Sequence, residues 1–120
     1  MRFAVLLLLS ACASLARAET SCIDSAADRE AFEECARKEM LPLEAKVVSR
    51  IAALRTKFRN DPQAREALEK SQDSWNAYRN GHCAIEAKAR GAGSEIGVQR
   101  AFAACARRKL ESRLKELDSL

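Results

Sequence analysis

The stretch DPQAREALEKSQDSWNAYRNGHCAIEAKARGAGS, residues 61–94, decides the fold because it carries one long helical pattern between two clear boundaries. Asp61 can cap a helix whose first residue is Pro62, where the missing N–H group of proline costs nothing. The segment 91–94 can end that helix and supply Ser94 as the N-cap of the next one. The residues of one helical face recur at steps of three and four, namely Leu68, Ser71, Trp75, Tyr78, His82, Ile85 and Ala89. The stretch therefore predicts a helix over residues 62–90.

A second apolar stripe precedes this helix and predicts another one, from about Ser25 to Phe58. Its residues are Phe32, Ala36, Met40, Leu43, Val47, Ile51, Leu54 and Phe58. Asp24 or Ser25 can cap its start. Pro42 removes a backbone donor and clashes with the preceding turn, so we expect a kink there or a break into two helices.

A third stripe follows Ser94 and predicts a helix to the end of the chain. It consists of Ile96, Phe102, Ala103, Ala106, Leu110, Leu114 and Leu117, and the outer face is expected to hold Arg107, Arg108, Lys109, Arg113 and Lys115. Short turns between long amphipathic helices favour antiparallel neighbours. We therefore expect an all-α hairpin stack or an up-down bundle of three to four helices.

The composition excludes several classes of function. A chain of 120 residues allows one small domain, and a formal charge of +4 of well-mixed sign does not indicate a nucleic-acid partner. The sequence has no Gly-rich phosphate loop, no H-E-x-x-H motif and no nucleophile with an evident base. We therefore expect neither catalysis, nor a cofactor, nor a small-molecule substrate.

The first eighteen residues have the pattern of a secretory signal. A short positive start, Met1-Arg2, precedes the apolar run from Phe3 to Leu9, and Ala16-Arg17-Ala18 suits a signal peptidase. Cleavage after Ala18 would leave a domain of residues 19–120 in the periplasm or outside the cell. The alternative is a lipobox ending at Cys12, which would anchor the protein to a membrane through a lipid. Without Arg2 and Arg17, 19 of the 21 basic residues remain against 17 acidic ones.

Either cut leaves four cysteines, Cys22, Cys35, Cys83 and Cys105, in a chain expected to be exported. An even number of cysteines in an oxidising compartment predicts two disulfides. The four cysteines have no C-x2-C spacing, which is the pattern that would favour a metal site instead. The last two cysteines are nearly equidistant from the turn at residues 93–94, which favours Cys83–Cys105 together with Cys22–Cys35. The turn at residues 60–61 permits Cys35–Cys83 with Cys22–Cys105, so both pairings stay open.

The block Ser71-Gln72-x-x-Trp75-x-x-Tyr78-Arg79-x-x-x-Cys83, followed by Gly93-Ser94, Cys105 and Arg113-x-x-x-Leu117, resembles the LprI family of bacterial lysozyme inhibitors. The Cys22 and Cys35 pair fits the first half of that family. The resemblance implies a lysozyme partner that is inhibited by occlusion of its substrate cleft. The alternative function is a structural or stress-related protein of the cell envelope with no inhibitory target.

Packing is the more common role for the residues of this block. Trp75 and Tyr78 lie on the predicted apolar stripe, and Arg79 is expected to pair with Glu86 or with a carboxylate of the first helix. A lysozyme partner of basic charge would be steered by an acidic patch. The residues predicted to form this patch are Glu33, Glu34, Glu39 and Glu44.

Overall fold

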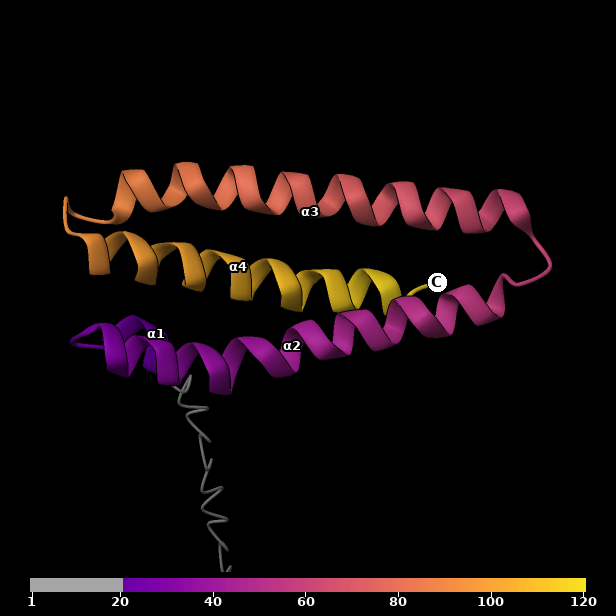
Figure 1. The fold of residues 1–120 in the computed structure, drawn as a ribbon. Coiled ribbons are helices and arrows are strands. Elements are labelled where there is room, and N and C mark those ends of the chain that lie inside the picture. Colours follow the sequence, from indigo (N-terminus) through magenta and orange to yellow (C-terminus); the bar gives the residue numbers. More distant parts are fainter. Residues whose placement is uncertain (1–20) are drawn as a thin grey trace, which may run out of the picture.

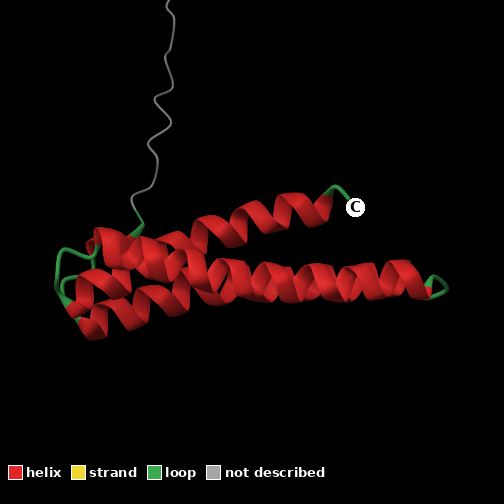
Figure 2. Ribbon diagram, turned by 90° about the horizontal axis from the view of Figure 1, so that it is seen from above, coloured by secondary structure: helices red, strands yellow, loops and turns green. Residues whose placement is uncertain are grey.

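The computed structural model describes residues 21–120, and this part of the chain is all-α, as the sequence predicts (Figures 1 and 2). Its helices are α1 (Cys22–Ser25), α2 (Arg29–Lys57), α3 (Pro62–Arg90) and α4 (Glu95–Asp118). No strand occurs within these residues. The expected leader, its cleavage site and Cys12 lie outside the described residues.

The boundaries of the two C-terminal helices agree with the prediction. The Asp61 side chain accepts a hydrogen bond from the backbone N–H of Ala64, and Pro62 is the first residue of α3. Ser94 caps α4 in the same way through the N–H of Gly97. These caps satisfy N–H groups that the first turn of a helix leaves without partners.

The expected start of the first long helix was wrong. Asp28 is the N-cap of α2, and its side chain accepts a hydrogen bond from the N–H of Ala31. Asp24 and Ser25 belong to the short helix α1, which Ser21 caps through the N–H of Ile23. The extra turn arises because Ile23 is fully buried and anchors this segment to the bundle.

Of the two outcomes expected at Pro42, a kink or a break into two helices, the break does not occur, because α2 continues through this residue without interruption. In Figure 1 the axis of α2 changes direction between its indigo and magenta parts. A bend lets a helix tolerate the ring of a proline and the lost hydrogen bond.

Helix α4 lies between α2 and α3 in the view of Figure 1, and Figure 2 shows its C-terminal part to one side of the other long helices. It packs against both, whereas α2 and α3 touch each other little. Helix α3 runs in the opposite direction to α2, and α4 runs in the opposite direction to α3, so consecutive long helices are antiparallel (Figure 1). The main core joins all three through Val47, Ile51, Leu54, Leu68, Leu110 and Leu117.

Two disulfides staple this thin core. Cys83 of α3 is bonded to Cys105 of α4, with their Cα atoms 5.5 Å apart, and both residues are fully buried. Cys22 is bonded to Cys35, with a Cα–Cα distance of 5.6 Å, and this bond ties α1 to α2. Of the two pairings considered, the structure therefore has Cys22–Cys35 with Cys83–Cys105, the pairing favoured by the turn at residues 93–94.

The predicted stripe of α3 was wrong in its second half. Tyr78 and Ile85 are 53% and 73% exposed, whereas Cys83 and Ala87 are buried. Beyond Trp75 the inner face advances by steps of four because the disulfide turns Cys83 towards α4. None of the helices in residues 21–120 is both long enough and apolar enough to cross a membrane.

Candidate functional site

The residues of the 71–83 block meet the C-terminal helix around the guanidinium group of Arg113. Its Nε donates to Oε1 of Gln72 at 3.2 Å, and one terminal nitrogen donates to Oγ of Ser71 at 3.0 Å. The other terminal nitrogen donates to Glu116 at 3.0 Å. Arg113 is only 8% exposed, so its expected place on the outer face was wrong. The sequence suggested a solvated cation because it shows the charge of Arg113 and not the polar partners on α3.

Two guanidinium groups lie against the indole ring of Trp75. The central carbon of Arg113 is 5.7 Å from the ring centroid, and that of Arg79 is 5.2 Å from it. A cation over the face of a tryptophan is attracted by the ring quadrupole. Trp75 also packs against the main core, so this stack joins the polar network to the apolar interior. Leu117, one turn beyond Arg113, is fully buried in the same core.

The expected ion pair of Arg79 was wrong. Within the described residues Arg79 has no carboxylate partner, and its Nε donates to the side chain of its neighbour Asn80 at 3.2 Å. Glu86 instead binds Arg108 of α4 and lies 3.5 Å from His82 and 3.6 Å from Arg90. These contacts make Glu86 the charged link between α3 and α4 beside the disulfide.

The environment of Glu86 lowers the pKa of its carboxyl group. Partial burial by itself raises this pKa, because it disfavours the charged form. The hydrogen bond from Arg108 and the positive charges of Arg108, Arg90 and His82 act in the opposite direction and outweigh burial. Glu86 is therefore a carboxylate at neutral pH.

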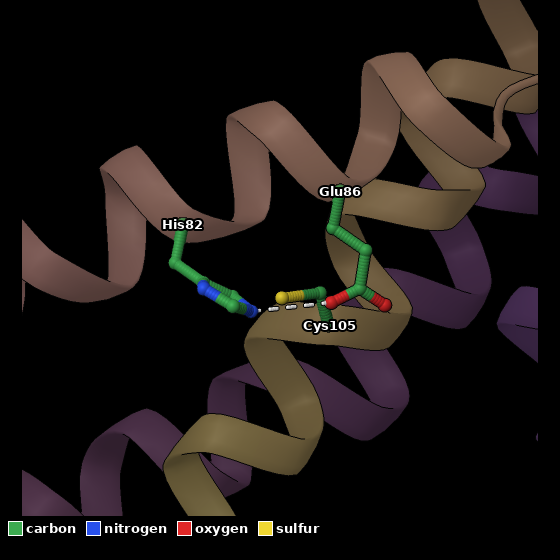
Figure 3. Close-up of side chains that lie close together, drawn as sticks. All are labelled: His82, Glu86 and Cys105. Carbon is green, nitrogen blue, oxygen red and sulfur yellow. Dashed lines mark ion pairs between the residues drawn. The ribbon is translucent and has the colours of Figure 1, made fainter.

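His82, Glu86 and Cys105 come close enough to suggest a metal site (Figure 3). Their possible ligand atoms lie within 4.8 Å of one another. However, the sulfur of Cys105 is bonded to Cys83 and offers no thiolate. The remaining imidazole and carboxylate already interact with each other, so the cluster acts as an ion pair beside a disulfide.

Tyr78 is held at the surface by Lys109 of α4. The ammonium group of Lys109 donates to the Tyr78 hydroxyl at 2.9 Å and lies 4.8 Å from the ring centroid. The ring of His82 follows at 5.5 Å between centroids. Tyr78 is therefore more exposed to solvent than Trp75, which is half-buried.

Gly93 and Ser94 shape the turn between α3 and α4. Gly93 has a φ of +73°, which a glycine adopts without steric cost. Ser94 then begins α4 as its N-cap. This turn brings the two helices back together so that Cys83 and Cys105 can meet.

The acidic residues predicted to form a patch are mostly engaged with groups of their own chain. Glu33 pairs with Arg29 at 2.9 Å, and Glu34 pairs with Arg37 and Lys38. The pKa of Glu34 is lowered, first by the hydrogen bond from Lys38 and then by the charge of Arg37.

Glu39 accepts hydrogen bonds from the Ser21 hydroxyl and from the backbone N–H of Cys22, so it fixes the N-terminal segment. Glu44 is exposed and has no ion-pair partner among residues 21–120. Of the four carboxylates, Glu33 and Glu34 are thus paired with cations of their own helix, whereas Glu44 is not.

A shallow groove runs where α2, α3 and α4 border one another. It consists of three adjoining hollows of about 310, 300 and 480 Å³. Glu44 and Arg79 line both of the first two hollows, and Phe102 and Ala103 line the second and third. Trp75 lies in the first hollow, so the groove begins at the stack described above. The sequence could not show it, since its walls come from three helices.

The turn between α2 and α3 is the other exposed feature. We call residues 58–61 the apex. Figures 1 and 2 show that α2 and α3 continue past the end of α4 and meet in this turn. The sequence marks the apex by its Asn60-Asp61-Pro62 boundary, but not by its position beyond the third helix.

Comparison with known proteins gives one match. The family model described as "Lysozyme inhibitor LprI" matches residues 22–117, which include both disulfides, the 71–83 block and Arg113. No curated protein and no solved structure matches the chain.

Proposed function

Because the chain belongs to the LprI lysozyme inhibitor family, we propose that it binds a lysozyme and blocks access of the substrate to the enzyme's cleft. The observation that carries this proposal is the match over residues 22–117, which spans nearly all of the described part. The family is one of inhibitors and not of enzymes. The action proposed is occlusion by contact between two proteins.

The rigidity of the domain supports this mode of action. Both disulfides and the buried Arg113 network hold the helices in one arrangement. A partner that is already ordered loses little conformational entropy on binding, so more of the contact energy appears as affinity. Inhibition by occlusion needs such a surface and no chemical step.

We also propose export, either to the periplasm or outside the cell, with cleavage after Ala18. The two disulfides suit an oxidising compartment. The intact mass of the native product tests this. A chain that starts at Glu19 without a lipid is expected, and a diacylglyceryl group on Cys12 would instead make the protein membrane-anchored.

The acidic residues of α2 are assigned a steering role in this proposal. Since Glu33 and Glu34 each pair with a nearby cation, their combined field is weak and acts only at low salt. Changing both to lysine is expected to slow association modestly at low ionic strength. An unchanged association rate would assign steering to another surface.

The direct test is a turbidity assay of cell-wall lysis with c-, g- and i-type lysozymes and an excess of the oxidised protein. The proposal predicts slower lysis with at least one of the three classes. Reduced and alkylated protein serves as the control, because it has the same composition without the stapled fold. Unchanged rates with all three enzymes would contradict the proposal and favour an envelope protein without an inhibitory target.

A further inference from the structure

The apex is narrow and well ordered. Its backbone N–H groups at Phe58, Arg59 and Asp61 donate to the carbonyls of Leu54, Thr56 and Phe58, respectively. The ring of Phe58 packs against the main core. The turn is therefore fixed to the bundle at its base while its outer residues stay exposed.

The end of α4 leaves the apex free. Lys57 donates a hydrogen bond to the carbonyl of Leu120, so the chain end reaches the base of the turn. Beyond that point α2 and α3 are the parts of residues 21–120 that contribute (Figure 1). The molecule thus ends in a convex projection that is two helices wide.

The charge of this projection is positive. Arg59 is exposed and has no ion pair within residues 21–120. Two acidic residues that follow it in the sequence have partners of their own, because Asp61 caps α3 and Glu66 pairs with Lys70 at 2.7 Å. Arg55 is matched by Glu69 at 2.6 Å, and within the apex, residues 58–61, Arg59 is the cation and has no ion pair in the described part of the chain.

The cleft of a glycosidase has the complementary shape and charge. Most such enzymes flank the scissile bond with two carboxylic residues at the bottom of a concave site. A guanidinium group matches a carboxylate in geometry through paired N–H donors. The groove at Trp75 is concave and cannot fill another concave site, whereas the apex is convex.

We propose that the apex enters the lysozyme cleft and that Arg59 pairs there with the catalytic carboxylates. Asn60 follows at the tip, and its side-chain amide offers the same donor and acceptor types as the acetamido group of a cell-wall sugar. This inference rests on the proposed inhibition and adds which surface performs it. A positive contact surface also agrees with the charge balance of residues 19–120, 19 basic against 17 acidic, because the cleft carries two carboxylic residues.

The test compares the inhibition constants of wild type, R59E, R59K and K88E against the lysozyme that the wild type inhibits best. Lys88 is an exposed residue near the opposite end of α3, so K88E makes the same change of charge far from the apex. R59E is expected to raise the inhibition constant at least about tenfold, because it places a like charge against the carboxylates. R59K should fall between R59E and the wild type, and K88E should stay within about twofold of the wild type.

Two results would overturn the inference, and they are distinguishable. If the wild type inhibits and R59E inhibits equally well, the apex does not enter the cleft, although the proposed function stands. If the wild type inhibits none of the three lysozyme classes, the proposed function fails and the role of Arg59 fails with it. Circular dichroism of each variant shows that its helices are intact.

Discussion

Arg113 shows how a charged residue becomes part of the interior of this small domain. Its three hydrogen bonds reach Ser71 and Gln72 on α3 and Glu116 on its own helix. The same guanidinium group lies against Trp75. A buried cation with satisfied donors joins two helices more specifically than an apolar contact of the same area.

Arg113→Ala is expected to lower the free energy of unfolding by about 2–4 kcal/mol. The estimate follows because hydrogen bonds to charged groups contribute about 1.5–3 kcal/mol each, while the freed partners regain some hydration. Urea denaturation of the oxidised protein measures the change. Lys115→Ala, on the exposed side of the same helix, is the control, and equal stability of the two variants would show that Arg113 contributes little.

Glu86 gives the fold a dependence on pH. Its pKa is lowered in the folded state, so it stabilises the fold at neutral pH, and this contribution is lost as the pH falls through the lowered pKa. Glu86→Gln should therefore melt below the wild type at about pH 7, and this gap should narrow at about pH 3, as the pH approaches or passes the lowered pKa.

Melting curves at the two pH values check this, with Glu111→Gln as a matched removal of one carboxylate elsewhere on the α3–α4 pair. A gap between wild type and Glu86→Gln that persists unchanged at the lower pH would contradict the assigned charge state. So would the absence of a gap at neutral pH.

At the scale of the helices, local sequence signals predict where α3 and α4 begin, but they do not predict which face of the helix is buried. The boundaries at Asp61-Pro62 and at Ser94 depend on capping, which involves only neighbouring residues, so the sequence predicted them. The inner face of α3 depends on where α4 lies, and the bond between Cys83 and Cys105 rotates that face away from Ile85.

In the candidate site, too, the sequence predicts the features that depend on neighbouring residues and misses the contacts between helices. The 71–83 block was recognisable because its residues are close in sequence and match a family pattern. The partners of Arg113 and the true contacts of Glu86 come from residues on facing helices. Such contacts depend on the register of α3 against α4, which periodicity alone does not give.

The two disulfides are expected to act on different parts of the bundle. Replacing Cys83 and Cys105 by alanine should lower the free energy of unfolding by about 3–5 kcal/mol, since the bond closes a separation of 22 residues and its sulfurs are buried.

Replacing Cys22 and Cys35 by alanine should chiefly release α1 from α2. Hydrogen exchange then shows faster exchange at residues 22–28 with α3 and α4 still protected, and loss of protection throughout would contradict this division.

At the scale of the whole molecule, the fold places its features at separate positions along one elongated bundle. The buried Arg113 network and the Cys83–Cys105 bond hold α3 to α4, and the groove follows the border of the three long helices. The apex projects beyond α4 (Figure 1), and its Arg59 has no ion pair among residues 21–120. Within residues 21–120 this end combines a convex shape with a cation that has no ion pair, which suits occlusion of a cleft.

Calorimetric titration of a lysozyme with the oxidised domain, with and without a saturating trimer of N-acetylglucosamine in the cleft, tests occlusion most directly. If the domain inhibits by filling the cleft, it should bind one enzyme molecule, and the trimer should abolish or greatly weaken that binding. Binding that the trimer leaves unchanged, or no binding to any of the three lysozyme classes, would contradict occlusion of the cleft.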